Sequence, residues 1–307
     1  MYTEKALQYT TMMLKRQPDF HTIWNYRRDI LNSLLSEANE TKQKTYMKNE
    51  FEIVSYVTFT NITKEKIVVT KRSNTLEHRY GLSNKNPKSY SLWHHRRWVV
   101  SKYIERMERS AGEMLKQELE LCRRFLKHDE RNFHCWNYRG FIISKLDMSE
   151  EENLKFTKEK VMENFSNYSA LHRRMRLFTK QSEEKNEDEL EEFLSSEIEM
   201  IKHSIFTEPD DQSPWLYLRW MMELAAKRLS SNAVDREIRS IIGCCHDICE
   251  EEKTEMKWPL LTEFHLLRLS RRSSEDDVRR GKEILKVLCR IDSNHRGYYE
   301  EQLICWR

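Results

Sequence analysis

The chain is 307 residues long, which is enough for one large or two ordinary domains with adequate cores. Its 53 Lys and Arg nearly balance its 50 Asp and Glu, so the net charge of +3 excludes a general electrostatic affinity for nucleic acid or anionic membranes, and any anion site must be local. Only 6 Gly and 5 Pro occur, 34% of the residues are charged, and the apolar residues recur at helical spacing, which predicts an almost entirely helical protein.

The first predicted element is a helical hairpin. Residues 5–16 carry apolar side chains at helical spacing, and the pattern stops at Pro18. A second helix is predicted over residues 20–35, with Asp19 placed to cap it.

The helical pattern is lost between residues 36 and 85. Residues 54–59 and 67–70 are rich in Val, Ile and aromatic residues and favour strand over helix. We interpret residues 51–85 as an irregular insertion of about 25 to 35 residues relative to the usual period of helical repeats. A surface loop or an artefact of the gene model is favoured over a functional insertion, because long loops are uncommon inside compact repeats.

Paired helices are predicted for the rest of the chain, and the signatures weaken after residue 233. Divergent helices over residues 233–306 suit the capping end of a solenoid. The predicted helices cover residues 113–126, 132–143, 150–164, 168–180, 188–206, 213–229, 233–252, 258–270, 275–290 and 295–306.

An internal repeat organises these hairpins, because an aromatic residue is followed three positions later by an arginine. The sequence therefore predicts one all-α domain over residues 1–307, built as a solenoid of antiparallel helical hairpins. The copies are Trp24-Asn-Tyr-Arg27, Trp93-His-His-Arg96 and Trp136-Asn-Tyr-Arg139, with degraded copies at Leu171-His-Arg-Arg174 and Trp215-Leu-Tyr-Leu218.

The repeated residues are predicted to be structural. Each tryptophan falls on the apolar stripe of the second helix of its hairpin, where its ring can wedge between helices. The arginine lies one turn later, where its guanidinium can bridge carbonyls or carboxylates of the adjacent repeat. This interpretation covers Trp24, Arg27, Trp93, Arg96, Trp136, Arg139 and Trp215.

The residues just before each aromatic open the second helix, where exposed N–H groups and the positive end of the helix dipole favour anions. A phosphate-bearing ligand along this edge would meet them. The alternative is that the asparagines are ordinary N-caps and the lysine is solvated. The candidate residues are Lys88 and Tyr90, Asn132 and His134, and Asn167 and Tyr168.

Two clusters suggest metal or acid–base chemistry, but the histidines are interpreted as packing or hydrogen-bonded residues and the cysteines as helix packing. His94 and His95 are adjacent on a helix and point roughly 100° apart, so they cannot both face one site. Cys244, Cys245 and Cys249 have no second ligand pair nearby, and helix packing is favoured over metal binding. No metal site is expected in this chain.

The cellular setting is predicted from what the sequence lacks. No stretch approaches the roughly 18 consecutive apolar residues of a spanning helix, and the first residues lack the order of a secretory signal. The seven cysteines are an odd number and are typical of a reducing compartment. We expect a cytoplasmic protein with no membrane span and no nucleic acid partner.

The repeats and the segments before them resemble the α subunits of protein prenyltransferases, and within that family the Rab geranylgeranyltransferase type. The resemblance covers about residues 4–230 apart from the insertion. It rests on five segments in the same order: Asp19-Phe-His-Thr-Ile-Trp-Asn-Tyr-Arg-Arg28, Asn86-Pro-Lys-Ser-Tyr90, Asp129-Glu-Arg-Asn-Phe-His-Cys-Trp136, Asn164-Phe-Ser-Asn-Tyr168 and Phe206-Thr-Glu-Pro-Asp-Asp-Gln-Ser213.

This resemblance implies a crescent-shaped, right-handed superhelix wrapped around a separate β subunit. The β subunit would carry the catalytic zinc, the lipid pocket and most diphosphate contacts, and the α subunit alone would be inactive. In such enzymes a zinc-bound cysteine thiolate of a Rab GTPase, presented by an escort protein, attacks C1 of geranylgeranyl diphosphate. Magnesium is expected around the diphosphate, although no ligand for it is legible here.

By the same resemblance, Lys88 and Tyr90 match the lysine and tyrosine that reach the diphosphate at the subunit interface. A cation and a phenol donor can stabilise the charge that grows on the leaving oxygens. Asn132 and His134 match interface residues of the next repeat. Ser91 replaces the glutamine that reads a peptide carboxylate in farnesyltransferases, and Phe133 replaces their tyrosine.

Two alternatives remain open at this point. The chain could be the α subunit shared by farnesyltransferase and geranylgeranyltransferase I, which the identity of the β subunit and dependence on an escort protein would distinguish. It could also be a non-catalytic helical-repeat adaptor, in which Lys88 and Tyr90 would be dispensable for any transfer reaction. The chain also begins directly at the first hairpin, which suggests a truncated gene model or a minimal protein.

Overall fold

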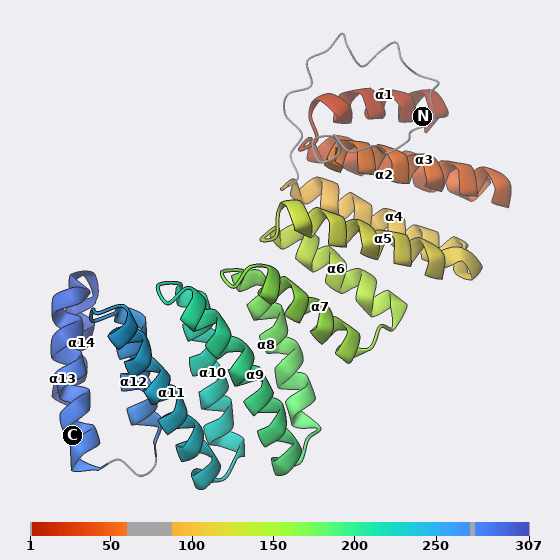
Figure 1. The fold of residues 1–307 in the computed structure, drawn as a ribbon. Helices are drawn as coiled ribbons and strands as arrows, with labels where there is room; N and C mark the ends of the chain where they lie inside the picture. Colours follow the sequence, from red (N-terminus) through yellow and green to blue (C-terminus); the bar gives the residue numbers. More distant parts are fainter. Residues whose placement is uncertain (1, 60–87, 271–273, 307) are drawn as a thin grey trace. The chain divides into compact units, whose positions relative to one another are not determined.

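The computed structural model describes residues 2–59, 88–270 and 274–306, and every regular element within these ranges is helical. The contacts divide the chain into two compact units, Met1–Met148 (unit 1) and Ser149–Arg307 (unit 2), which are described separately (Figure 1). The predicted all-α class with helical hairpins is confirmed. That residues 1–307 form a single domain stays a prediction.

Unit 1 consists of three hairpins. In each of them the two helices pack on one another, and the second helices α2, α4 and α6 also contact each other in turn. Trp24, Leu92 and Val99 lie in its core. The helices are α1 (Glu4–Arg16), α2 (His21–Glu37), α3 (Glu40–Phe59), α4 (Tyr90–Arg106), α5 (Glu108–His128) and α6 (Phe133–Leu146).

Two predictions for unit 1 are wrong. The strand-like segment 54–59 is the last turn and a half of helix α3, because Met47, Val54 and Val57 share one face of that helix and are buried in the core. Packing of this face therefore overrides the strand preference of Val. The N-cap position of helix α2 is occupied by Phe20, which makes no side-chain cap hydrogen bond, and not by Asp19. The rest of the predicted insertion, residues 60–85, lies outside the described residues.

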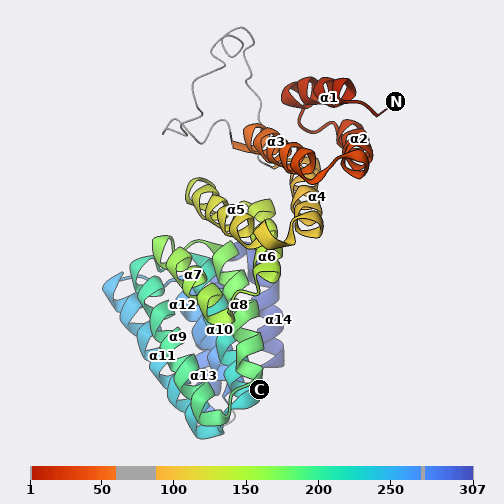
Figure 2. The ribbon, with the colours of Figure 1, turned by 90° about the vertical axis from the view of Figure 1, so that its right-hand side faces the viewer.

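Unit 2 repeats the same plan and ends in a second core around Phe264, Leu285 and Tyr299. Second helices α8, α10 and α12 contact each other in turn, and α9 lies beside α11 (Figure 2). Each helix of unit 2 begins and ends within three residues of its predicted bounds. The helices are α7 (Glu150–Glu163), α8 (Tyr168–Glu183), α9 (Glu187–Thr207), α10 (Gln212–Arg228), α11 (Ser231–Glu251), α12 (Lys257–Leu269), α13 (Glu275–Ile291) and α14 (Arg296–Cys305), with a 3-10 turn at Ser293–His295 before α14.

The repeated tryptophans tie the second helix of a hairpin to the turn that precedes it. In three of them the buried indole Nε1–H donates to the carbonyl six residues earlier, which satisfies its polar atom while the ring fills the core. The bonds run from Trp24 to Pro18 at 2.7 Å, from Trp136 to Glu130 at 2.7 Å and from Trp215 to Pro209 at 2.8 Å.

A buried glutamate on the first helix of a hairpin joins that hairpin to the one before it. Arg27 of α2 donates two hydrogen bonds of 2.7 Å to the Glu50 carboxylate on α3, and His95 of α4 donates a third of 2.7 Å through Nε2. All three side chains are at most 1% exposed. We call this arrangement a carboxylate clamp. It stabilises the packing because the arginine charge is paired and every carboxylate oxygen is bonded.

The carboxylate of the first clamp is strongly stabilised in its charged form. Burial alone would raise the pKa of Glu50, but the Arg27 charge and the hydrogen bonds from His95 and Arg27 lower it to about 2. Burial lowers the pKa of His95 in spite of its bond to Glu50, so the imidazole is neutral at neutral pH. The predicted packing role of His95 is therefore a hydrogen-bonded one.

The clamp recurs twice with a tyrosine in place of the histidine. Its spacing is constant, with 22 or 23 residues from the arginine to the glutamate and 20 from the glutamate to the tyrosine, whereas Glu50 and His95 are 45 apart. The additional 25 residues therefore lie inside the second hairpin. The two further clamps are Arg96, Glu118 and Tyr138, and Arg174, Glu197 and Tyr217.

Candidate functional site

The start of the second helix has the same construction in four hairpins. A polar residue four positions before the repeated aromatic accepts a hydrogen bond from a backbone N–H of the first turn, which satisfies a donor that the helix leaves unpaired. The acceptors are Ser89 for Leu92 N at 3.4 Å, Asn132 for Cys135 N at 2.9 Å, Asn167 for Ala170 N at 3.0 Å and Asp211 for Ser213 N at 2.7 Å.

This construction determines where the predicted asparagines lie. Asn132 is 1% and Asn167 0% exposed, and the side-chain oxygen of each is engaged as an N-cap. A contact of either amide with a diphosphate stays a prediction. Tyr168, the first residue of α8 in unit 2, is 56% exposed, and its contact with a ligand stays a prediction as well.

Lys88 and Tyr90 lie on either side of the cap of α4. Because Ser89 is buried, its two neighbours are directed outward, and Lys88 is exposed while Tyr90 is 74% exposed. The side chains stand at the positive end of the α4 dipole, so an ammonium and a phenol O–H are presented where an anion is already favoured.

His134 of α6 joins this pair from the next hairpin. Its ring meets the Tyr90 ring edge-on at 4.4 Å between centroids and lies parallel to the Trp93 ring at 6.5 Å. It also forms a hydrogen bond with the backbone of Lys88. Burial and the Lys88 charge lower the pKa of His134 and outweigh that bond, so the imidazole is neutral at neutral pH.

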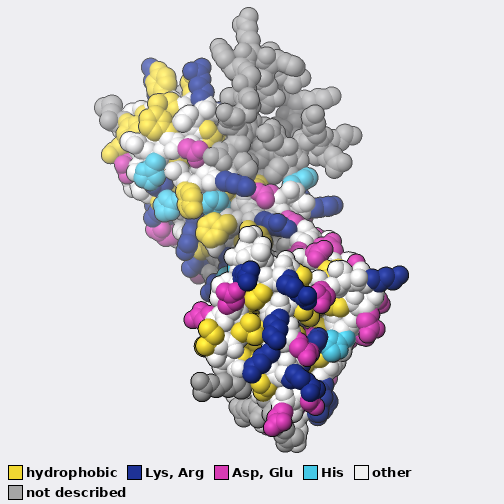
Figure 3. Space-filling view, turned by 90° about the vertical axis from the view of Figure 1, so that its left-hand side faces the viewer, with side chains coloured by type: hydrophobic (Ala, Val, Ile, Leu, Met, Phe, Trp, Pro, Cys, Tyr) yellow, Lys and Arg dark blue, Asp and Glu magenta, His cyan; other side chains and the backbone are white. Residues whose placement is uncertain are grey.

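Unit 1 therefore brings three of the predicted residues, Lys88, Tyr90 and His134, into one group. We call it the donor group. Phe133 is 57% exposed and packs its ring 5.3 Å from His134, so the donors stand beside an exposed apolar ring. Histidine and hydrophobic side chains lie next to each other on the face of unit 1 shown in Figure 3. The arrangement can bind the oxygens of an anionic group whose other end is apolar.

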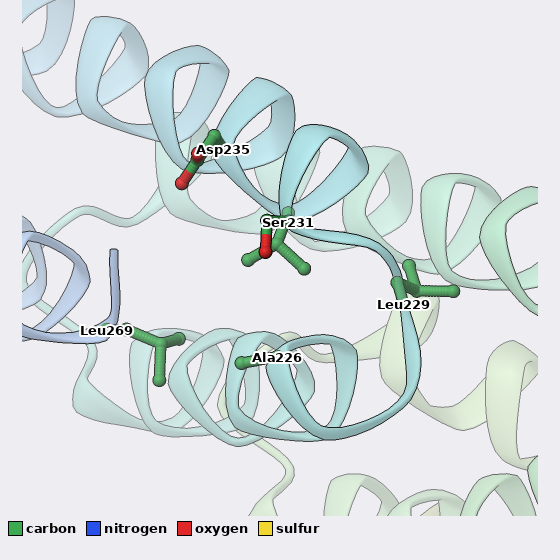
Figure 4. A pocket seen from close by; sticks show the side chains of 6 residues that line it. Ala226, Leu229, Ser231, Asp235 and Leu269 are labelled. Atoms are coloured by element: carbon green, nitrogen blue, oxygen red, sulfur yellow. The ribbon is translucent and has the colours of Figure 1, made fainter. Parts of the chain in front are cut away.

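A small cavity in unit 2 is unrelated to these residues. It lies between α10, α11 and α12, and the Asp235 carboxylate at its edge accepts a hydrogen bond from Ser270 at 3.2 Å (Figure 4). Its volume is about 10 Å³, far below the roughly 300 to 1,000 Å³ of ligand pockets. The cavity is lined by Ala226, Leu229, Ser231, Val234, Asp235 and Leu269.

The described residues contain no group of three or more His, Cys, Asp or Glu side chains that could hold a metal ion. Cys245 is buried among the helices of unit 2, and burial raises the pKa of its thiol well above the ordinary value. In the described part of the chain, no helix is long and apolar enough to cross a membrane.

Comparison with known proteins identifies the repeat. The family sequence model for the protein prenyltransferase alpha subunit repeat matches residues 3–34, 81–103, 115–146 and 194–225. A Dictyostelium discoideum protein named geranylgeranyl transferase type-2 subunit alpha is 31% identical over 299 residues, which are 97% of this chain and 84% of that protein. The chain belongs to the protein prenyltransferase α-subunit family.

Other members of this family have the same name but differ in length. The rat geranylgeranyl transferase type-2 subunit alpha is 34% identical over 252 residues, 81% of this chain, and the chain spans only 37% of that protein. The Saccharomyces cerevisiae protein is 30% identical over 228 residues, 73% of this chain and 60% of that protein. A solved Candida albicans protein geranylgeranyltransferase-I complexed with GGPP has a TM-score of 0.69 at 17% identity over 100% of this chain and 85% of that one. This likeness shows the fold alone.

The clamp glutamates are the important residues that sequence reasoning missed. A signal for them existed, because Glu50, Glu118 and Glu197 recur 22 or 23 residues after a repeat arginine. The prediction that each arginine bridges to the adjacent repeat could have been extended to search for a carboxylate at that fixed spacing.

Proposed function

We propose that this chain is the α subunit of a heterodimeric Rab geranylgeranyltransferase in the cytoplasm. The enzyme would transfer geranylgeranyl from geranylgeranyl diphosphate to C-terminal cysteines of Rab GTPases presented by an escort protein, and this chain would be active only with a β subunit. The names of the relatives from rat, yeast and Dictyostelium support this choice within the family. The single observation that carries it is the donor group of Lys88, Tyr90 and His134.

The donor group suits the leaving group of this reaction. The cysteine thiolate sulfur forms a bond to C1 of the isoprenoid, the bond from C1 to the diphosphate oxygen breaks, and diphosphate leaves with the electron pair. Lys88 and Tyr90 would donate to the oxygens on which this charge grows, and they are oriented before the reaction by the buried cap Ser89. Neutral His134 would hold the Lys88 backbone and the Tyr90 ring without adding positive charge.

The remaining chemistry would belong to the partners. We assign the zinc that activates the thiol to the β subunit and expect magnesium around the diphosphate. Ser91, with its short side chain, offers less reach toward a peptide carboxylate than the glutamine of farnesyltransferases, which is consistent with substrate delivery by an escort protein.

The proposal is tested by co-expressing the full chain with a type-2 β subunit and measuring geranylgeranyl transfer to a Rab protein with escort protein. Lys88→Ala should lower kcat by about 10²- to 10³-fold, the effect of losing one preorganised donor. Lys102→Ala is the matched control, because Lys102 lies near the far end of α4, the helix that Lys88 precedes, and pairs there with Glu105.

The outcomes separate the alternatives. A heterodimer that transfers lipid only with escort protein, and that loses at least tenfold in rate with Lys88→Ala but not with Lys102→Ala, supports the proposal. A heterodimer with an unaltered rate removes Lys88 from the chemistry. Activity on isolated tail peptides without escort protein favours the shared α subunit, and failure to pair with any β subunit favours an adaptor.

A further inference from the structure

A second group of basic side chains lies on α2 and α4 of unit 1. His21, Asn25 and Arg28 stand at positions i, i+4 and i+7 of α2 and therefore share one face. The Asn25 amide contacts His21 Nδ1 at 3.3 Å and its oxygen accepts a hydrogen bond from Arg28 Nη2. The bridging amide thus fixes the imidazole and the guanidinium relative to each other.

The guanidinium of Arg28 is only partly satisfied. Its Nη1 is buried and has no hydrogen-bond partner among the described residues. Burial lowers the pKa of Arg28, and the Asp29 carboxylate opposes this only in part. A buried cationic N–H without an acceptor is costly, so this nitrogen marks a position where an acceptor is missing.

Two further basic residues, His94 and Arg97, lie on α4, which contacts α2. Arg97 packs its guanidinium 4.6 Å from the centre of the Phe141 ring, which orients it from the side of α6. Burial lowers the pKa of His94, and the charges of Arg28, His21 and Arg97 lower it further. The guanidiniums of Arg28 and Arg97 are thus near enough to act on His94, whose side chain is exposed.

We propose that His21, Arg28, His94 and Arg97 form a binding site for a phosphate-class oxyanion, inorganic phosphate or diphosphate. An anion that carries several acceptor oxygens would supply the partner that Arg28 Nη1 lacks and would be attracted by the guanidiniums of Arg28 and Arg97. A phosphate suits the site better than a single carboxylate, because its additional oxygens could accept from both guanidiniums and from the imidazoles.

This site differs from the donor group. His94 is one helical turn beyond Tyr90 on α4 and takes no part in the Ser89 cap or in the contact between Tyr90 and His134. Binding of a free oxyanion needs no β subunit and no isoprenoid. The inference therefore does not depend on the proposed function, and either can fail alone.

The test is a titration of the full chain with inorganic diphosphate, followed through the NMR signals of its histidine rings, with His94→Gln used for assignment. Diphosphate should shift the His21 and His94 signals with a Kd below about 1 mM. Arg28→Gln should weaken binding at least about tenfold, and the matched control Arg109→Gln, an exposed arginine of α5, should leave it unchanged.

Each result decides the question. Shifts that saturate and that Arg28→Gln removes support the site, and repeating the titration with orthophosphate shows which phosphate it prefers. No shift up to about 10 mM diphosphate overturns it, and so does an equal response to acetate, which would indicate a general carboxylate site. If Arg28→Gln changes the helical content, the exposed Arg97→Gln replaces it as the decisive variant.

Discussion

Replacing Glu50 by glutamine should destabilise unit 1 by about 3 kcal/mol at neutral pH. The folded-state pKa of Glu50 is about 2 against an ordinary value of 4.5, and this difference corresponds to about 3 kcal/mol of stabilisation when the carboxylate is charged. Removing one partner of a buried ion pair independently costs about 3 to 5 kcal/mol, because the Arg27 guanidinium would stay buried without its counter-charge. The two routes agree in magnitude.

The pH dependence has a defined sign. Because folding lowers the pKa of Glu50, its contribution is complete above about pH 5 and is lost as the pH falls toward 2. Hydrogen exchange with mass spectrometry on peptides of α2 and α3 measures the opening free energy of this unit without assuming that both units unfold together.

The matched control is Glu52→Gln, an exposed glutamate on the same helix, which should change the opening free energy by less than about 0.5 kcal/mol. If Glu50→Gln opens with the same free energy as the wild type at pH 7, the clamp does not hold these hairpins together. The same conclusion follows if acid destabilises wild type and variant equally between pH 5 and 3.

Three further predictions concern unit 2. Trp215→Ala should lower the free energy of unfolding by about 3 to 5 kcal/mol, measured by urea denaturation, whereas Leu216→Ala at the exposed neighbouring position should have little effect. Asn167→Ala should cost about 1 kcal/mol through loss of the cap of α8, and Asn167→Asp should retain most of it; equal losses would contradict the cap. In Gly281→Ala the new methyl group would lie 2.6 Å from Trp306 Nε1, so the indole should be displaced, lose its bond to the Val278 carbonyl and shift its fluorescence to longer wavelength; unchanged emission would show that the contact relaxes without moving the ring.

Much of the helical layout could be predicted because it depends on local periodicity. The turns after Phe125 and before Trp215 contain Asp and Glu, with Pro209 in the second, between strong apolar stripes, and the helices begin and end close to the predicted residues. Lys88 and Tyr90 could be located for the same reason, because their distance from Trp93 places them at a helix start. Local sequence patterns are sufficient for features that depend on a single helix, such as its bounds and the residues at its start.

The predictions are wrong or missing for features that depend on a contact between different helices. Val54 and Val57 favour a strand by residue type, and only their burial in the core of unit 1 explains why they are helical. His95 gives no sign of its partner, because Glu50 is 45 residues away. The basic group of His21, Arg28, His94 and Arg97 likewise combines residues of two helices whose registration no single-helix pattern specifies.

The spacing of the carboxylate clamps shows that the length of a hairpin can vary without changing how that hairpin is aligned with the one before it. The distance from arginine to glutamate is nearly invariant, because it sets which turn of one hairpin faces which turn of the next. The distance from the glutamate to the tyrosine or histidine can grow from 20 to 45 residues, and the arginine, the carboxylate and the ring-bearing side chain still meet. Insertions and deletions should therefore be tolerated in evolution, and in engineered grafts, at the turn inside a hairpin, and be selected against at the connection between hairpins.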